Sequence, residues 1–241
     1  MIAIVGLTVG ILMGSTAIGG LLLAPGVNII AGIPLKIAIP ACVATFVLTG
    51  IVSTTIYTRH SSLAWKDLTI LSFGAAPGAF IGAFVLSHLS TSGIQLGIAA
   101  LAVLSGLYTL IDDSRVVLSD RTTSSGFLIG VGAIVGFLSA VTGTGGPLVL
   151  LPILLVSGVP ILKAVGLAQA IQIPVGVLAT TGNVFFSTID MGLVTVLGIA
   201  VVVGAAVGAM GAQRFSTKYL KTSVAVVLIV VGIGYGFGSW G

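Results

Sequence analysis

Charged side chains are scarce in this chain of 241 residues: 6% are Asp, Glu, Lys or Arg, while 57% are hydrophobic. The mean hydropathy is +1.29. A soluble globular domain carries about 25% charged residues. Because so few charges cannot cover the surface of a soluble protein of this size, lipid must be the main solvent. The composition therefore excludes a soluble domain and predicts a polytopic membrane protein.

Reactive and metal-binding side chains are also few. The single cysteine, Cys42, excludes an intrachain disulfide, and the two histidines, His60 and His88, fall in expected loops, so there is no paired-histidine metal set. The sequence contains neither a Gly-x-Ser-x-Gly elbow nor a phosphate-binding P-loop. Thr144 as a nucleophile would need a nearby base, and the expected spans contain none. We therefore expect no enzyme activity, no metal and no cofactor.

Basic residues outnumber acidic ones, nine to five, and give the chain a net charge of +4. They stand singly in expected loops, which is typical of topology signals in a membrane protein and not of a nucleic-acid site. The first charge is Lys36, and no basic segment precedes the first apolar run, so we expect no cleavable signal peptide. The expected partner is the lipid bilayer, and nucleic acid is not.

The apolar stretches lack the alternating pattern of membrane-barrel strands, so the expected fold class is an all-α polytopic membrane protein. One span takes about 20 residues. The first repeat, 1–111, is expected to hold a broken hairpin over 1–31 and helices over 38–57, 68–87 and 94–111. A polar linker over 112–125 follows. The second repeat, 126–241, is expected to hold a broken hairpin over 126–158 and helices over 164–183, 191–213 and 219–238.

The two halves of the chain are repeats of one another. When the first half is shifted by 126 residues it falls on the second without a gap, and the matching residues keep their order. The matches include Val5-Gly6 with Val131-Gly132, Thr16 with Thr142, Gly19-Gly20 with Gly145-Gly146, Thr54-Thr55 with Thr180-Thr181, and Gly78-Ala79 with Gly204-Ala205. An ordered series of this kind indicates an internal duplication.

The broken first segment of each half decides how the repeats are oriented. As one tilted helix it makes the halves parallel and divides the basic residues five to four between the two sides. As a hairpin it makes them inverted, with eight basic residues on one side and Lys36 alone on the other. Since cytoplasmic loops carry the excess of Lys and Arg, we predict inverted-topology repeats, external termini and a cytoplasmic 112–125 linker. The depth to which the hairpins enter the bilayer stays open.

Polar, glycine-rich breaks interrupt both hairpins, "SAVTGTGGP" at 139–147 and "GSTAIGG" at 14–20. In lipid, non-helical backbone is tolerated only inside protein or beside a watery cavity. Helices that begin at these breaks would point their positive ends at the midplane, where they favour an anion. Close helix packing is the alternative use of such small residues. The expected site residues at the breaks are Thr16, Gly19, Gly20, Thr142, Thr144, Gly145 and Gly146.

Three amide side chains extend this candidate anion site. Gln169 and Gln172 are three residues apart and share a helical face, whereas their counterparts in the first half, Val43 and Phe46, are apolar. A face that is polar in one half only is expected where a symmetric scaffold holds an asymmetric substrate. Asn28 follows the first break. Hydrogen bonding between helices is the alternative role for these amides.

The repeated pattern VGxxxG…TxxGG…G[IV]P…TT…GAxxGA resembles the TauE/SafE sulfite exporter family, also called DUF81 or TSUP permeases. The resemblance covers essentially the whole chain. It implies a multi-pass plasma-membrane transporter of a sulfur-containing anion such as sulfite, a sulfonate or sulfoacetate. Where the second half has Val141-Thr-Gly-Thr144, the first has Ser15-Thr-Ala-Ile18, so the two half-sites are expected to contribute unequally.

These features together predict a secondary transporter that moves a small sulfur-containing anion by alternating access. The alternative is an uncoupled anion channel or facilitator of the same fold. Saturable flux with counterflow would indicate a carrier, and high, non-saturating conductance would indicate a pore. The identity of the anion, the direction of transport, a coupling ion (proton or sodium) and homo-oligomerisation stay open at this stage.

Overall fold

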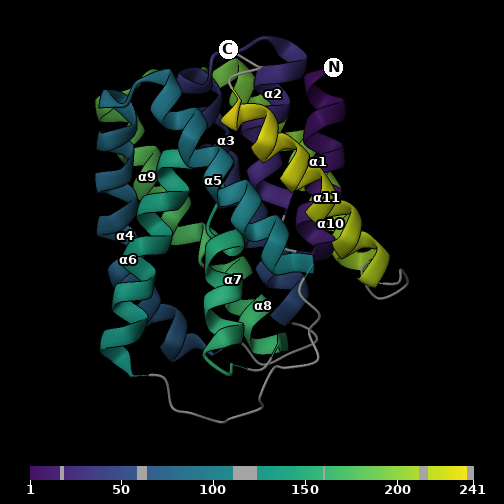
Figure 1. Cartoon of the computed structure of the whole chain (residues 1–241). Coiled ribbons are helices and arrows are strands. Elements are labelled where there is room, and N and C mark those ends of the chain that lie inside the picture. Colours follow the sequence, from purple (N-terminus) through teal and green to yellow (C-terminus); the bar gives the residue numbers. More distant parts are fainter. Residues whose placement is uncertain (17–18, 59–63, 111–123, 160, 212–216, 238–241) are drawn as a thin grey trace.

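A computed structural model of the chain describes residues 1–16, 19–58, 64–110, 124–159, 161–211 and 217–237. No strand occurs among these residues, so the expected all-α class is confirmed (Figure 1). In chain order the helices are α1 (Ile2–Thr16), the short 3-10 helix η1 (Gly19–Leu22), α2 (Leu23–Ala31), α3 (Leu35–Thr58), α4 (Trp65–His88), α5 (Thr91–Leu110), α6 (Ser125–Thr142), α7 (Pro147–Val156), α8 (Ile161–Ala170), α9 (Gln172–Phe186), α10 (Met191–Gly211) and α11 (Thr217–Gly236).

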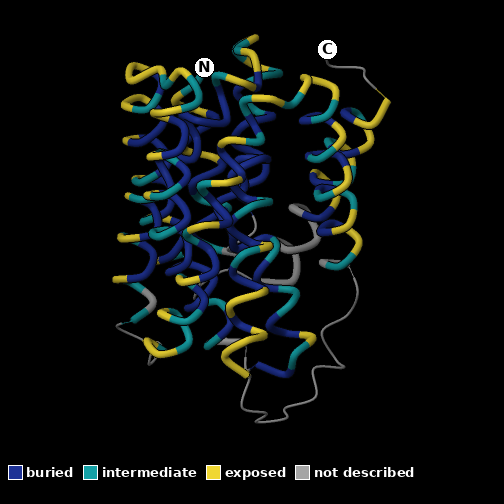
Figure 2. The backbone as a smooth tube through the Cα atoms, turned by 90° about the vertical axis from the view of Figure 1, so that its left-hand side faces the viewer, coloured by how far each residue is buried: buried dark blue, intermediate teal, exposed yellow. Residues whose placement is uncertain are grey.

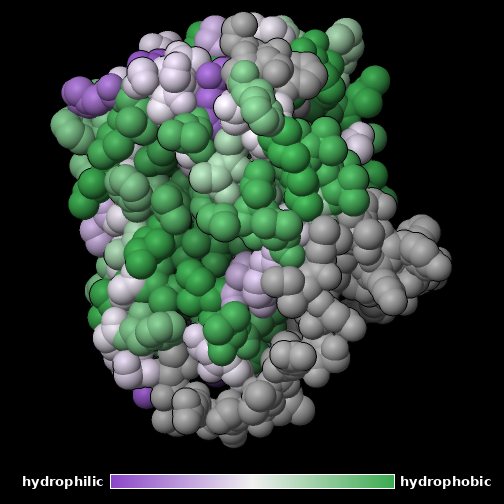
Figure 3. All heavy atoms as spheres, in the orientation of Figure 1, coloured by the Kyte–Doolittle hydropathy of each residue, from purple (hydrophilic) through white to green (hydrophobic). Residues whose placement is uncertain are grey.

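The described helices have the length and surface of a membrane protein. Six segments are long and apolar enough to cross a bilayer: Leu35–Ile56, Trp65–His88, Thr91–Tyr108, Ser125–Thr142, Lys163–Phe186 and Met191–Gly211. Large apolar side chains point outward, such as Phe73, which is 72% exposed, and Ile199, which is 66% exposed. Hydrophobic residues cover the middle of the face in Figure 3, and hydrophilic ones gather toward its ends. The chain is therefore a multi-pass membrane protein.

Each half of the chain begins with helices that fold back on themselves. In the first half, Gly19 lies beside Leu12 and Gly26 beside Val5, which lays α2 back along α1. The helices α2 and α7 have 9 and 10 residues. At about 1.5 Å per residue they are half as long as the roughly 30 Å hydrocarbon core. The helix α2 lies toward one end of the bundle and α7 toward the other, so both breaks fall near its middle (Figure 1).

The segment expected as one helix over 164–183 is divided in the structure. The helices α8 and α9 meet at Ile171, which stands in a turn between them. Pro174 is the physical reason, because a proline has no N–H to donate to the carbonyl four residues earlier, here that of Ala170. The Ile171 amide still donates to the carbonyl of Leu167 at 2.9 Å, so the interruption is short.

Glycines set the contacts between the two halves. Gly78 in α4 lies against the backbone of Ala133 in α6, and Gly204 in α10 lies against the backbone of Leu7 in α1. Both members of the second contact differ from those of the first by 126 positions, so the α4–α6 contact recurs as the α10–α1 contact. Because an added Cβ would meet backbone atoms at both places, Gly78 and Gly204 serve close helix packing.

Candidate functional site

The break between α6 and α7 is built from glycines with positive φ. Gly143, at φ 69°, caps α6 and donates its N–H to the carbonyl of Ser139 at 2.8 Å. Gly145 and Gly146 follow at φ 78° and 106°, a region that residues with side chains rarely adopt. Pro147 opens α7 at the position where a helix tolerates a missing N–H. The glycines are therefore what allows the chain to turn here.

This turn leaves backbone donors without partners at the start of α7. Within the part of the chain that the structure describes, the amide N–H groups of Gly145, Gly146 and Leu148 donate no hydrogen bond. All three residues are buried. Figure 2 shows that the buried backbone, in dark blue, fills the interior of the bundle. A helix N-terminus carries about half a positive elementary charge, and leaving a buried N–H unpaired costs roughly 1–3 kcal/mol. An anion placed here would satisfy both the charge and the donors.

Three buried hydroxyl groups belong to the same break. The Thr142 hydroxyl donates to the carbonyl of Leu138 at 2.6 Å. Thr144 Oγ1 lies 3.3 Å from Ser139 Oγ and 3.5 Å from Thr142 Oγ1. These two separations are long for a hydrogen bond between hydroxyls, whose oxygen–oxygen distance is most often about 2.7–2.8 Å. The Thr144 hydroxyl can therefore turn to a ligand at little cost, whereas that of Thr142 is engaged by its own helix.

The first break reaches the second. A Cβ on Gly20 would lie 3.3 Å from the carbonyl carbon of Thr144 and closer to its oxygen, so the two breaks are in contact. Gly19 faces α1 of its own hairpin instead. The structure thus brings Gly20 to the glycines of the second break and does not bring Gly19 there. The side chain of Thr16 lies outside the described residues.

The two glutamines join α8 and α9 to the first hairpin. Gln169 Nε2 donates to the carbonyl of Met13 at 3.1 Å, and Gln172 Nε2 donates to Gln169 Oε1 at 2.5 Å. Both side chains are buried, and Gln172 Oε1 has no hydrogen-bond partner among the described residues. The pair therefore bonds two helices together and also presents one free acceptor inside the bundle. An acceptor does not bind an anion directly, but it can receive a proton from a ligand hydroxyl or amine.

Asn28 lies away from the break. Its Nδ2 donates to the carbonyl of Ile33 at 2.9 Å, and its Oδ1 accepts a hydrogen bond from the Tyr235 hydroxyl at 2.7 Å. These partners lie where α2 turns into α3 and at the end of α11. Asn28 thus ties the end of the first hairpin to the last helix, and the structure does not bring it to the other expected site residues.

Comparison with known proteins now decides the family. The family model of the sulfite exporter TauE/SafE matches residues 2–235. The chain belongs to the TauE/SafE family of membrane transporters. It is 25% identical to the probable membrane transporter protein MJ0441 of Methanocaldococcus jannaschii, over 97% of this chain and 93% of that protein. It is 24% identical to the probable membrane transporter protein YdhB of Bacillus subtilis, over 97% of this chain and 98% of that protein. No solved structure shows a significant match.

In this TauE/SafE family member, the sequence patterns did not single out several polar groups. Ser139 enters the site because it lies one turn before the break. Thr54 and Asn183 are buried and Thr180 is partly buried, and each has buried side-chain atoms without partners among the described residues. Thr54 and Thr180 are equivalent in the two repeats, and that match was the available signal. Asn183 has no amide counterpart, since Tyr57 occupies the matching position.

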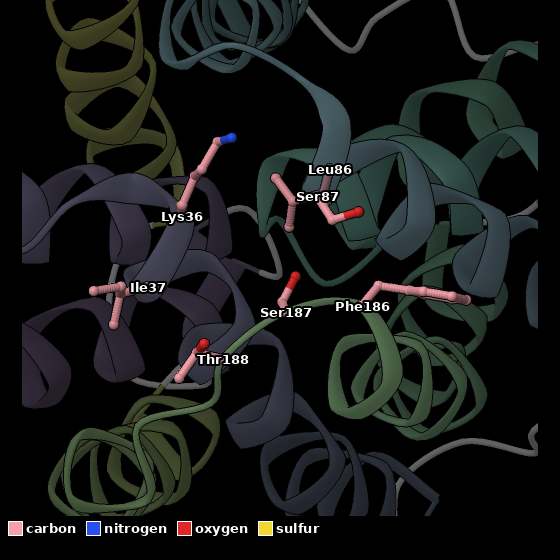
Figure 4. A pocket seen from close by; sticks show the side chains of 7 residues that line it. All are labelled: Lys36, Ile37, Leu86, Ser87, Phe186, Ser187 and Thr188. Atoms are coloured by element: carbon pink, nitrogen blue, oxygen red, sulfur yellow. The ribbon is translucent and has the colours of Figure 1, made fainter.

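The two ends of α4 differ in this TauE/SafE transporter. At its start, Lys163 Nζ of α8 lies 2.6 Å from Asp67 Oδ2. Near its end, a cavity of about 200 Å³ lies between Ser87, Lys36 at the start of α3, and the segment that follows α9 (Figure 4). The helix has 24 residues, or roughly 36 Å at 1.5 Å per residue. An ion pair thus joins α4 to α8 at one end of α4, and a cavity lies between α4 and α3 at the other end.

Proposed function

We propose that this protein is a secondary transporter for a small sulfur-containing anion, of the sulfite, sulfonate or sulfoacetate class, in the plasma membrane. The observation that carries the proposal is the buried start of α7, where three amide N–H groups donate no hydrogen bond to the residues that the structure describes. The substrate would bind there, between the two breaks, and would be released to the other side when the halves rearrange. Membership of the TauE/SafE family supports both transport and the class of substrate.

An anion fits this break better than a cation or a neutral solute. A helix N-terminus and free N–H groups attract negative charge and repel positive charge. No acidic side chain belongs to the break segment 139–147. Hydrogen bonds to a charged partner contribute roughly 1.5–3 kcal/mol each, so two or three amides and the Thr144 hydroxyl are sufficient for micromolar to millimolar binding.

Alternating access by two inverted repeats is the mechanism we propose for this site. The recurrence of the α4–α6 contact as the α10–α1 contact supports an exchange of roles between the halves. The entry of the two short hairpins from opposite ends of the bundle supports the inverted orientation (Figure 1). In each state of such a cycle one end of the molecule is closed and the other is open. The ion pair at one end of α4 and the cavity at the other support this asymmetry.

Flux into proteoliposomes of the purified chain tests this function. We expect saturable uptake of sulfite or a short sulfonate, accelerated when the same anion is preloaded inside, because counterflow is the property of a carrier. Sulfate and chloride, tested in parallel, define selectivity. Gln172→Leu should change the order of preference among anions more than the maximal rate. Flux that does not saturate and shows no counterflow would indicate the channel instead, and absence of anion flux would refute the proposal.

A further inference from the structure

The two buried glutamines beside the break have a fixed hydrogen-bond direction. Gln169 Nε2 donates to the carbonyl of Met13 at 3.1 Å, and a carbonyl can only accept. The oxygen of this amide, Gln169 Oε1, accepts in turn from Gln172 Nε2 at 2.5 Å. Turning over one or both amides would bring two oxygens together, either at Met13 or between the glutamines. The Met13 carbonyl therefore fixes Gln172 Oε1 as the free end of this chain of hydrogen bonds.

This free end is an acceptor in the interior of the bundle. Gln172 is 1% exposed, and its Oε1 has no partner among the described residues. Buried polar groups are normally hydrogen-bonded, and leaving one unpaired is costly. Gln172 Oε1 is therefore available to a donor that the described chain does not supply.

Contacts place the glutamine pair beside both breaks. An added Cβ on Gly146, in the second break, would lie 3.0 Å from Cγ2 of Ile171, the residue between the two glutamines and next to the second of them. An added Cβ on Gly20, in the first break, would lie 3.5 Å from Cε of Met13, whose carbonyl holds the pair. The pair thus borders the same region as the free amides at the start of α7.

The internal repeat shows that this region is polar in different ways on its two sides. Positions 46 and 172 are equivalent in the two halves. The ring of Phe46 packs on Gly145 of the second break, where an added Cβ would lie 2.9 Å from a ring carbon. The amide of Gln172 is instead joined to the first hairpin through Gln169 and Met13. An anion between the breaks would therefore meet N–H and hydroxyl donors on one side and a single acceptor on the other.

We propose that Gln172 is a specificity-determining residue, which selects an anion that carries its own hydrogen-bond donor: a singly protonated oxyanion such as hydrogen sulfite, in preference to the fully ionised dianion. The ionised oxygens accept from the amides at the start of α7 and from the Thr144 hydroxyl, and the protonated oxygen donates to Gln172 Oε1. A dianion has no proton to donate and would set a charged oxygen against the amide oxygen. The inference rests on the proposed function and narrows its substrate to the protonated form.

The pH dependence of binding to the purified wild-type chain tests this selection, because sulfite takes up a proton near neutral pH. Above that transition the apparent Kd for total sulfite should rise about tenfold for each pH unit, since only the protonated fraction binds. Methanesulfinate is the matched probe, because it has a methyl group in place of the hydroxyl of hydrogen sulfite and stays ionised. Its Kd should not change with pH and should be about tenfold higher than that of hydrogen sulfite.

The pH profile is assigned to the ligand because α9 and α6 contain no ionisable side chain. The other helices packed against α9 are α3, α4 and α8, whose ionisable side chains are Lys36, Cys42, Tyr57, Lys66, Asp67, His88 and Lys163. Lys163 is paired with Asp67 and stands nine positions before Gln172, and Cys42 stands eight positions from Gly50, where α3 packs against Gln172. At 1.5 Å per residue these separations are roughly 12 Å or more along the helices. The flat profile expected for methanesulfinate is the control for all of these groups.

Variants of the two glutamines separate this role from a purely structural one. Gln172→Met keeps the length of the side chain and removes the acceptor, so hydrogen sulfite and methanesulfinate should bind with equal affinity. Gln169→Met removes the group that orients Gln172, so the amide NH2 can turn to the ligand and the rise of Kd with pH should become shallower. The control is Thr181→Val at an exposed position of α9, which should keep both the tenfold preference and the pH profile.

The same measurements distinguish this inference from the proposed function. Equal affinity of the wild type for hydrogen sulfite and methanesulfinate, or a Kd for total sulfite that does not rise with pH, would overturn the selection and mean that water satisfies Gln172 Oε1. If Thr144→Val still weakens the binding of both probes in that case, the central site stands without the selection. If Gln172→Met abolishes the preference but proteoliposomes show no anion flux, the role of Gln172 stands and the transport function fails.

Discussion

Replacing Gly78 with alanine tests how closely the two halves of the molecule pack. The added Cβ would lie 3.0 Å from both the Cα and the carbonyl carbon of Ala133. Because these are backbone atoms, α4 and α6 have to move apart. Overpacking of a close contact costs about 1–3 kcal/mol, whereas alanine in place of glycine in a helix interior gains roughly 1 kcal/mol. The packing cost therefore equals or exceeds the helix gain, and Gly78→Ala should be neutral to destabilising by up to about 2 kcal/mol.

The matched control is Gly130→Ala in α6, where the added Cβ meets no atom within 4 Å and only the helix gain remains. The free energy of unfolding, measured by denaturant titration in mixed micelles, should be about 1–3 kcal/mol lower for Gly78→Ala than for Gly130→Ala. Gly204→Ala should behave like Gly78→Ala, since Gly204 meets the backbone of Leu7 in the equivalent contact. Equal stability of Gly78→Ala and Gly130→Ala would refute the reasoning.

Three further results are expected. In a chain whose native cysteine is replaced by alanine, cysteines at Lys36 and Lys66 should react with an impermeant reagent from opposite sides of the membrane; labelling from the same side would contradict the inverted repeat. Asp67→Asn should lower the free energy of unfolding by less than about 1 kcal/mol, because the side chains of Lys163 and Asp67 are 40% and 24% exposed and water screens the pair; a loss of several kcal/mol would show the pair to be effectively buried. Gly146→Ala should cost about 1–3 kcal/mol of stability from backbone strain at φ 106°, and a neutral effect in the same unfolding assay would mean that the break relaxes freely.

The helical membrane class was accessible from sequence because it depends on composition alone. The role of Gly78 was accessible because a small residue every fourth position has few uses in a membrane helix other than close packing. The ends of α1 and α6 in the structure also fall inside the two glycine-rich stretches, and in the second of them glycines with positive φ interrupt the helix. In each case the signal lies within a few neighbouring residues.

Other features depend on contacts between residues that are far apart in the sequence, and no local sequence pattern predicts them. Asn28 resembles a site residue in sequence, but Tyr235 engages it from 207 positions away. The cavity at Lys36 is assembled from the ends of three elements, and no pattern in the sequence around Lys36 indicates it. The free amides of Gly145 and Gly146 are backbone groups, and their lack of partners is visible only once the chain is folded.

Equilibrium binding of an anion to the wild-type chain and to Thr144→Val tests the proposed central site most directly. The valine keeps the shape of the threonine and removes a buried hydroxyl whose neighbour, Ser139 Oγ, is 3.3 Å away. Thr181→Val is the matched control, since that hydroxyl is exposed and donates to the carbonyl of Val177 at 2.8 Å. With sulfite or 1-propanesulfonate as ligand, we predict that Thr144→Val raises Kd about tenfold or more while Thr181→Val leaves it unchanged. Wild-type affinity in a correctly folded Thr144→Val variant would mean that the break serves packing or hinge motion and that the anion binds elsewhere.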